Sequence, residues 1–497
     1  MRITLDDSEI NKSPIKKPRD LDKKQISEIK NISKKSHVRQ PNRNSNKVQK
    51  TTKIILIITG ILLVIFLSYG GYLGYKAYKA GKQMGFSFNP SDVISQELPK
   101  LKKDSTETYT NALIVGIDTR ETGNLLNTDT IILASYNHKT NNLIMISIPR
   151  DFHVEIDPET YWFNRINAIY STYEEKGEGE GLLRIREVVT EITGHEIQYH
   201  AMIDYKGFVE LIDTLGGVDI NVENSFTDYM YPERSGYKTV SFQEGPQFMD
   251  GKTALEYSRS RHSLHNNEGS DFARARRQQN VITAVADKVL SSSLLDPQSL
   301  MNLFNVIQEN VKISKFTINN IEAAVTELKK FRESGESYSF VLDPNAGAGR
   351  LITDKNVVNT GAYAIGPIDG LGNYENIQKY ISHVWKDPKL YEEDPTIRIY
   401  NTGLGYTETR EQYLALDQAL PYLKLSYMGT LHNEKEKTFS YVNASEGFTH
   451  SLKSINSHIN PDSTEKPEYI NTNLNGEDIT VLYGKEIVSN GDSPDAQ

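Results

Sequence analysis

Five arginines lie close together in the second half of the chain. They fall between Arg259 and Arg277, where the only acids are Glu268 and Asp271; the other three arginines are Arg261, Arg274 and Arg276. A guanidinium group is planar, stays charged and can donate two parallel hydrogen bonds to one phosphate. The cluster therefore predicts a phosphate or pyrophosphate ligand. A solvated helix surface is the alternative that the arginines alone leave open.

The spacing of three polar residues indicates that they share one face of a helix. Asp271, Arg274 and Gln278 stand at positions i, i+3 and i+7 of the segment DFARARRQQ. Side chains at these intervals project from the same side of an α-helix. We therefore expect the three to face one ligand together.

A second group of charges is predicted at the open end of a β-hairpin. Two apolar runs, 129–136 and 143–150, flank the turn-forming sequence NHKTNN, which is typical of antiparallel strands. A pairing symmetric about this turn places Ala134 opposite Met145 and Asp129 opposite Arg150. An aspartate and an arginine should therefore meet where the hairpin opens.

Asp118 stands at the carboxyl end of the preceding apolar run, ALIVGID. If that run is a neighbouring strand that ends on the same side, Asp118, Asp129 and Arg150 converge at one sheet edge, where open α/β folds place ligands. The alternative is a structural ion pair that closes the hairpin. Two carboxylates beside arginines would complete a pyrophosphate site, because Mg²⁺ binds through one or two carboxylates plus substrate phosphates.

The elements that position these residues indicate a layered α/β fold. NALIVGID, TDTIILASYN, NNLIMISIP and SYSFVLD are short runs rich in branched residues, as in strands buried on both faces. Apolar residues at helical spacing, or helix-forming sequences, follow at 182–192, 208–215, 253–261, 271–290, 299–310, 317–331 and 373–385. Strands that alternate with amphipathic helices predict helices on both faces of the sheet. A similar pattern restarts near 395 and predicts a small C-terminal α/β domain over 395–485, followed by a tail at 486–497.

Composition excludes several kinds of site. The 497 residues include no cysteine, which removes disulfide scaffolds, thiolate zinc sites and cysteine nucleophiles. The chain has no P-loop, no GxSxG elbow and no HExxH motif. Its length predicts more than one domain.

Charge and hydropathy predict how the chain is placed at a membrane. Residues 1–53 hold fifteen Lys and Arg against six acids, a charge of +9, which leaves −18 for the remaining 444 residues because the whole chain carries −9. The uncharged run of 22 residues at 54–75 is long enough to cross a bilayer. We expect a single-pass signal anchor with a disordered cytoplasmic tail at 1–53, a stalk at 76–108 and the folded part outside the cell. A cleaved signal peptide and a nucleic-acid-binding arm are the rival interpretations.

The order of these motifs resembles the LytR-CpsA-Psr family of Gram-positive cell-envelope proteins. The resemblance rests on GIDTR, TDT, SIPRD, RINAIY, LGGVDI, GPQFMDGKTALEYSRSR and DFARARRQQ. It implies a three-layer α/β/α catalytic domain over about 109–390 that holds a polyprenyl chain. It also implies Mg²⁺, with Mn²⁺ as a possible substitute, and transfer of a teichoic acid or capsule-type polymer from undecaprenyl pyrophosphate to peptidoglycan.

The resemblance also implies a role for each candidate residue. Asp118 and Asp129 match metal-binding acids. The residues that match pyrophosphate-binding positions are Arg150, Arg259, Arg261, Arg274 and Gln278. Arg150, Arg259 and Asp271 are the catalytic candidates. The implied partners are the lipid-linked glycan donor, the peptidoglycan acceptor and membrane lipid, with no nucleic acid.

Two other functions stay open at this point. The same site could only hydrolyse a polyprenyl pyrophosphate, or the protein could be a non-catalytic envelope regulator. The segment from Tyr229 to Phe248 is longer than the family pattern, and we expect a loop over the pocket there.

Overall fold

The computed structural model describes only part of the chain. The described residues are 100–118, 127–233, 236–289, 310–314, 318–344, 351–355, 357–358, 363–443, 447–470 and 474–485. The expected tail, signal anchor, most of the stalk, the helix at 299–310 and the C-terminal tail lie outside them. Within the described residues, no helix has both the length and the apolar character needed to cross a membrane.

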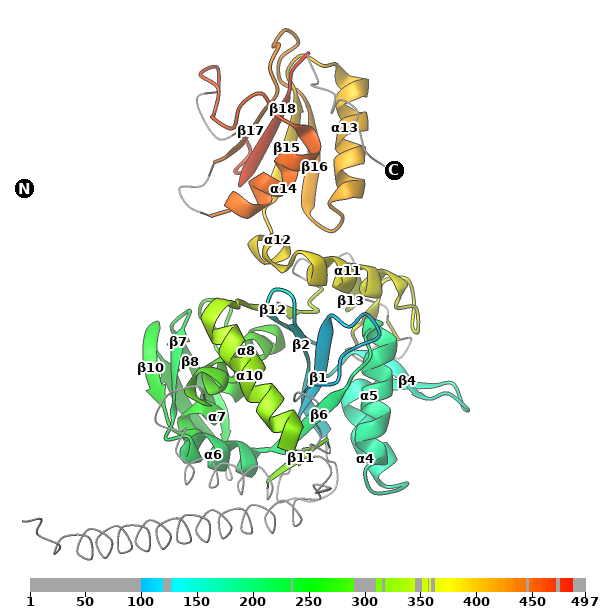
Figure 1. The fold of residues 1–497 in the computed structure, drawn as a ribbon, viewed down its shortest axis with the longest axis vertical. Coiled ribbons are helices and arrows are strands. Elements are labelled where there is room, and N and C mark those ends of the chain that lie inside the picture. Colours follow the sequence, from blue (N-terminus) through cyan, green and yellow to red (C-terminus); the bar gives the residue numbers. More distant parts are fainter. Residues whose placement is uncertain are drawn as a thin grey trace, which may run out of the picture. The chain divides into compact units, whose positions relative to one another are not determined.

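A six-stranded mixed sheet forms the centre of the first folded region (Figure 1). Its order is β11-β6-β1-β2-β3-β12. The β1–β2, β2–β3 and β6–β11 pairs are antiparallel, whereas β1–β6 and β3–β12 are parallel. The strands are β1 (Tyr109–Asp118), β2 (Asn127–Asn137), β3 (Leu143–Ser147), β6 (Tyr199–Asp204), β11 (Val311–Ile313) and β12 (Ser337–Val341).

Helices cover both faces of this sheet. On one face, Leu113, Leu133 and Ile146 belong to the same apolar core as residues of α5 (Glu180–Thr193) and α11 (Glu375–Lys386). On the other face, Ile132 and Met145 pack with Ile282 of α8 (Asp271–Val289). Alternate residues of a strand point to opposite faces, so the branched runs fill both layers. The layered α/β fold predicted from the sequence is confirmed.

The predicted hairpin register is also confirmed. Ala134 pairs with Met145 and Leu133 with Ile146. The neighbouring strand β1 is antiparallel to β2 and brings Asp118 opposite Asn127. A β-bulge interrupts this pairing, because Gly116 pairs with Thr130 but Ile117 pairs with Thr128. Asp129 is the extra residue, and a bulge redirects the side chain that it carries.

The segment expected to form a loop between Tyr229 and Phe248 is instead built of paired strands. β8 (Phe226–Glu233) pairs with β9 (Gly236–Phe242), and β10 (Gly245–Met249) pairs with β7 (Val218–Val222). The loop prediction was wrong because the buried side chains of this segment pack into a second apolar core with α6 (Tyr205–Thr214) and α7 (Gly251–Arg259). The residues that carry this core on β8 and β9 are Phe226, Tyr231, Val240 and Phe242.

Short elements complete the first region. A small hairpin joins β4 (His153–Asp157) to β5 (Trp162–Arg165), and β13 (Ile352–Thr353) pairs with β14 (Gly366–Pro367). The other elements are η1 (Ile166–Ala168), α4 (Ile169–Glu174), α10 (Ile318–Ser334) and α12 (Pro388–Glu393). Residues 100–108, which composition assigns to the stalk, lie against the fold, since Asp104 is buried and accepts the backbone N–H of Tyr109 at 3.0 Å.

Residues 396–483 form a second sheet with the order β16-β15-β18-β17. β15 is parallel to β16 and β18, and β17 is antiparallel to β18. The strands are β15 (Thr396–Asn401), β16 (Lys424–Thr430), β17 (Phe439–Val442) and β18 (Ile479–Tyr483), and the helices are α13 (Tyr406–Ala419) and α14 (Thr449–Ile459).

Candidate active site

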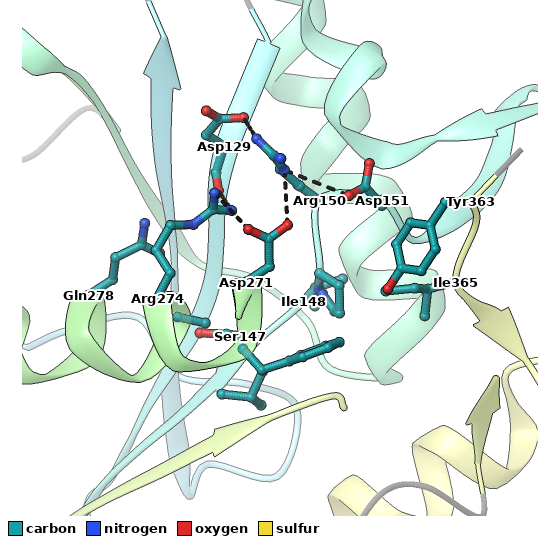
Figure 2. A pocket seen from close by; sticks show the side chains of 14 residues that line it. Asp129, Ser147, Ile148, Arg150, Asp151, Asp271, Arg274, Gln278, Tyr363 and Ile365 are labelled. Atoms are coloured by element: carbon teal, nitrogen blue, oxygen red, sulfur yellow. Dashed lines mark hydrogen bonds and ion pairs between the residues drawn. The ribbon is translucent and has the colours of Figure 1, made fainter. Parts of the chain in front are cut away.

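Arg150 lies at the centre of a charged cluster just beyond the end of β3. Its Nη1 donates a hydrogen bond of 2.9 Å to Oδ1 of Asp129, the pair predicted from the hairpin register. Its Nε lies 3.5 Å from Oδ2 of Asp271 and 3.7 Å from Oδ2 of Asp151 (Figure 2). Burial opposes the charged form, but Asp129 and Asp271 outweigh it and raise the pKa of Arg150. The guanidinium is therefore held as a permanent cation by three carboxylates.

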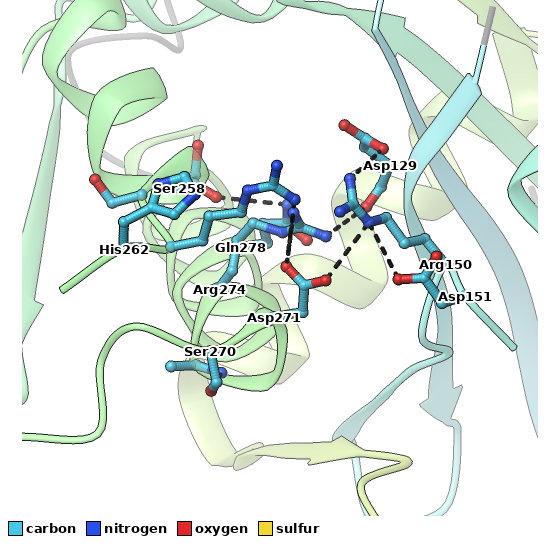
Figure 3. Close-up of polar contacts among 12 residues, drawn as sticks. Asp129, Arg150, Asp151, Ser258, His262, Ser270, Asp271, Arg274 and Gln278 are labelled. Atoms are coloured by element: carbon cyan, nitrogen blue, oxygen red, sulfur yellow. Dashed lines mark hydrogen bonds and ion pairs between the residues drawn. The ribbon is translucent and has the colours of Figure 1, made fainter. Parts of the chain in front are cut away.

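The first turns of α8 face this cluster. Nη1 of Arg274 lies 3.0 Å from Oδ1 of Asp271, and its Nη2 donates to the backbone carbonyl of Asp129 at 3.4 Å (Figure 3). Arg261 approaches Asp271 at 4.0 Å from the loop after α7. Burial lowers the pKa of Arg274, although Asp271 acts in the opposite direction. An arginine stays protonated in proteins even so. The charged residues of the predicted helix face, Asp271 and Arg274, therefore belong to one site.

Arg259 is positioned by two tyrosines at the end of α7. Its guanidinium lies 4.0 Å from the ring centroid of Tyr205, and its Nη1 donates to the Tyr231 hydroxyl at 3.2 Å. The Tyr205 hydroxyl in turn lies 3.5 Å from Oδ2 of Asp129. Burial raises the pKa of Tyr205 to about 12. The negative charges of Asp129 and Asp118 act in the same direction, and the positive charge of Arg259 opposes them. Tyr205 thus connects the predicted metal acids to a predicted pyrophosphate residue as a neutral phenol.

Asp118 is buried at the end of β1, and its charge acts on the Tyr205 hydroxyl together with that of Asp129. The two predicted metal acids therefore share one neighbourhood. Among the residues that the structure describes, no group of three or more His, Asp or Glu side chains could hold a metal ion. Two carboxylates still match what Mg²⁺ uses when substrate phosphates supply further oxygens.

The charged residues form a wall shared by two cavities. The wall consists of Asp129, Arg150, Arg274 and Gln278, which line both. The first cavity, here named the Tyr205 cavity, is completed by Thr130, Tyr205, Pro232, Arg259 and Arg261. The second, here named the Tyr363 cavity, is completed mainly by Ser147, Ile148, Asp151, Asp271, Tyr363 and Ile365 (Figure 2). All the predicted site residues other than Asp118 line at least one of them.

Several residues of this site were not predicted as functional. Asp151 and Arg165 belong to the motifs SIPRD and RINAIY, but their types alone indicated no role. Nη1 of Arg165 lies 3.0 Å from Oδ1 of Asp151, and its Nη2 donates to the backbone carbonyl of Tyr363 at 3.0 Å. Tyr205 and Tyr363 carried no sequence signal, because a tyrosine in an apolar pattern is usually a core residue.

The arginine cluster of the sequence divides into two roles. Arg277 is buried against Glu268 and donates to the backbone carbonyls of Tyr257, at 2.9 Å, and Ser260. It therefore supports the end of α7, which carries Arg259, and the start of the following loop, which carries Arg261. Arg276 lines neither the Tyr205 nor the Tyr363 cavity. Only three of the five clustered arginines, Arg259, Arg261 and Arg274, line the Tyr205 cavity.

The sequence model of the LytR_cpsA_psr family matches residues 72–338, which is more than half of the chain. This protein belongs to the LytR_cpsA_psr family. The match covers the charged wall and the α7 and α8 residues that line the cavities, whereas Val341, Tyr363 and Ile365 of the Tyr363 cavity lie outside it.

Family members with similar sequences include two proteins named polyisoprenyl-teichoic acid–peptidoglycan teichoic acid transferase TagU. The one from Oceanobacillus iheyensis is 31% identical over 224 residues, which are 44% of this chain and 65% of that protein. The one from Bacillus subtilis is 28% identical over 246 residues, 48% of this chain and 72% of that protein. The crystal structure of B. subtilis TagV aligns with 57% of this chain and 98% of its own, at 22% identity and a TM-score of 0.42.

Proposed function

We propose that this protein transfers a glycopolymer of the teichoic acid or capsule type from a polyprenyl pyrophosphate carrier to peptidoglycan. The observation that carries the proposal is the charged wall together with Asp271, because Arg150 and Arg274 meet Asp129 and Asp271 within hydrogen-bonding or ion-pair distance. Two family members bear the name of such a transferase. Cleavage of a phosphoanhydride is mainly a matter of positioning and of stabilising charge, which fixed guanidinium groups provide.

The donor pyrophosphate fits the Tyr205 cavity best. Arg259 and Arg261 line only this cavity, and Arg150, Arg274 and Gln278 reach it from the wall. The guanidinium groups suit the four non-bridging oxygens of a pyrophosphate diester, which share two negative charges.

Asp118 and Asp129 would hold Mg²⁺, or Mn²⁺ in its place, next to this pyrophosphate. The fit rests on two carboxylates, one on each of the neighbouring strands β1 and β2, whose charges both act on Tyr205. A bound divalent cation would neutralise the phosphate oxygens and so favour departure of polyprenyl phosphate. The expected signal anchor at 54–75 would keep the site at the outer face of the cell membrane, where a lipid-linked donor lies.

The direct test is transfer by the full-length protein in detergent, with a lipid-linked pyrophosphate glycan as donor and peptidoglycan fragments as acceptor. We expect transfer with Mg²⁺ and none with EDTA. Asp129→Ala and Arg150→Ala should each lower the rate by about 100-fold or more, as loss of a charge-stabilising group does. Asp219→Ala, an exposed site on β7, and Arg410→Ala, an exposed site on α13, are the matched controls. Normal activity in the first two variants would contradict the assignment of the site.

The same assay separates the alternative functions. A hydrolase would release the labelled glycan as a free product, whereas a transferase incorporates the label into peptidoglycan. A regulator that acts through its cytoplasmic tail would lose function when residues 1–50 are deleted and the anchor is kept, whereas the transferase would keep its activity.

A further inference from the structure

The charged wall has two sides, and the two sides differ in chemistry. The Tyr205 cavity adds two arginines, Arg259 and Arg261, to the wall. The Tyr363 cavity adds two carboxylates, Asp151 and Asp271, one half-exposed tyrosine ring and apolar side chains. In Figure 3, Ser258 and His262 lie on one side of Asp271 and Asp151 on the other. An anion is favoured on the first side, and a neutral hydroxyl compound is favoured on the second.

We propose that the Tyr363 cavity is the acceptor site and binds a neutral sugar through its hydroxyl groups. This inference rests on the proposed transfer function. In a phosphoryl transfer the attacking and leaving oxygens lie roughly in line on opposite sides of the phosphorus. A donor bound in the Tyr205 cavity places its phosphorus at the charged wall. The nucleophile then approaches from the Tyr363 cavity on the other side.

The side chains of the Tyr363 cavity suit a sugar. Carboxylates of Asp151 and Asp271 can accept hydrogen bonds from ring hydroxyls, and the Tyr363 ring, 51% exposed, can stack on a pyranose face. Burial and the charges of nearby aspartates, among them Asp151 and Asp271, raise the pKa of Tyr363. Its hydroxyl is therefore a neutral donor to a sugar oxygen.

This cavity is held in shape before any ligand binds. Ile365 forms a bridge with Phe152: the His153 N–H donates to the Ile365 carbonyl at 2.7 Å, and the Ile365 N–H donates to the Asp151 carbonyl at 3.2 Å. Arg165 adds a link between the Asp151 carboxylate and the Tyr363 carbonyl, each at 3.0 Å. The segment that carries Tyr363 is thus fixed to the segment that carries Arg150 and Asp151, which lowers the entropy cost of binding.

The step places Asp271 as the proton acceptor. The acceptor hydroxyl oxygen forms a bond to the phosphorus that carries the glycopolymer. The bond from that phosphorus to the bridging oxygen breaks, and its electron pair leaves with polyprenyl phosphate. The hydroxyl proton passes to the Asp271 carboxylate, which is 32% exposed and lies between the guanidinium groups of Arg150, Arg261 and Arg274. Asp151, at 11% exposed, is less accessible to the acceptor hydroxyl than Asp271.

The experiment compares Tyr363→Ala, Tyr363→Phe and Tyr406→Ala in the full-length protein in detergent. Tyr406 lies on α13, is similarly exposed and serves as the control for loss of a tyrosine ring. We expect Tyr363→Ala to raise the KM for soluble peptidoglycan fragments about tenfold, the loss of one stacking contact. The Kd for a fluorescent polyprenyl pyrophosphate analogue should stay within about twofold of wild type. Tyr363→Phe, which keeps the ring, should retain most of the affinity for the fragments.

A binding measurement without turnover keeps this inference apart from the proposed function. Titration of the same fragments into the wild-type protein, followed by calorimetry, should show binding that Tyr363→Ala weakens and Tyr406→Ala does not. Equal fragment affinity in wild type and Tyr363→Ala would overturn the acceptor site even if transfer is normal. Fragment binding that depends on Tyr363 in a protein that only hydrolyses the donor would support the site and overturn the transferase.

Discussion

Each arginine of the cluster owes its role to the partner that its side chain meets. Arg150, Arg259 and Arg274 contact carboxylates or tyrosine rings in the walls of the two cavities, whereas Arg277 is used up by backbone carbonyls and Glu268. The loop after α7 also depends on a fully buried acid, Asp228. Its Oδ2 accepts the backbone N–H groups of Arg261, at 3.0 Å, and His262, at 3.2 Å. Charge at the site is therefore placed by residues that no ligand needs to touch.

Asp228→Asn should weaken the site without removing any of its arginines. An amide replaces the charged acceptor of two backbone N–H groups, and hydrogen bonds to charged groups contribute about 1.5–3 kcal/mol each. We expect the free energy of unfolding to fall by about 2 kcal/mol. Affinity for a polyprenyl pyrophosphate analogue should fall by about tenfold as Arg261 loses its fixed position.

Urea unfolding and equilibrium binding measure the two effects of Asp228→Asn. Asp219→Asn, on the exposed side of β7, is the control and should change neither quantity. Unchanged binding in a destabilised Asp228→Asn protein would show that Asp228 stabilises the fold alone.

At the level of elements, features that depend on local sequence patterns could be predicted, whereas features that depend on long-range packing could not. The branched runs of β1, β2 and β3 and the turn between them were sufficient for the register that brings Asp129 to Arg150. The bulge at Asp129 was not predictable, because it depends on how β1 and β2 fit together. Tyr363 reaches the site through a bridge between Phe152 and Ile365, which lie 213 positions apart. No hydrophobic periodicity of the sequence predicts a contact between residues so far apart.

The strands β8 and β9 show a different limit. Their buried residues alternate with polar and exposed ones, but two exposed aromatic side chains, Tyr229 and Tyr237, obscure the pattern. We interpreted the segment as a loop because it is longer than the family pattern. Tertiary burial of Phe226 and Phe242 against Tyr257 of α7 decides its conformation instead, with ring centroids 6.1 and 5.3 Å from that of Tyr257.

The connection between α7 and α8 should depend strongly on the buried pair of Arg277 and Glu268. Removal of one member leaves the other charge buried without its counterion, at a cost of about 3–5 kcal/mol. Arg277→Met is therefore expected to lower the free energy of unfolding by about 3 kcal/mol or more. The double variant with Glu268→Leu should recover part of this loss, because neither charge then remains.

Urea unfolding of wild type, Arg277→Met, Glu268→Leu and the double variant forms a double-mutant cycle. Arg276→Met is the control, since Arg276 is the adjacent residue of α8 and is only partly buried. Additive losses in the double variant would mean that Arg277 acts through its bonds to the carbonyls of Tyr257 and Ser260 and that Glu268 contributes independently.

On the scale of the whole molecule, charge is distributed unevenly in several respects. The net −9 combines +9 in residues 1–53 with −18 in the remainder, and within that acidic remainder the charged wall concentrates arginines. Histidines add a response to pH. Burial lowers the pKa of His138, His153, His195, His200 and His383. His195 stacks on Trp385 at 4.9 Å and so joins the end of α5 to α11.

These histidines should make the fold less stable in mild acid. An unfolded histidine has a pKa of about 6.5 and takes up a proton as the pH falls below that value. A folded histidine with a lowered pKa does not, so the unfolded state binds more protons and the free energy of unfolding decreases with falling pH. Above pH 7 both states are neutral at these residues, and their contribution is constant. His195→Phe, which keeps a ring against Trp385, should therefore reduce the loss of stability between pH 7.5 and 5.5.

Urea unfolding followed by tryptophan fluorescence measures this loss of stability, with His458→Phe at an exposed site of α14 as the control. If His195→Phe and wild type lose the same stability over this range, His195 takes up a proton equally well in the folded and the unfolded state. Its burial would then have no energetic consequence.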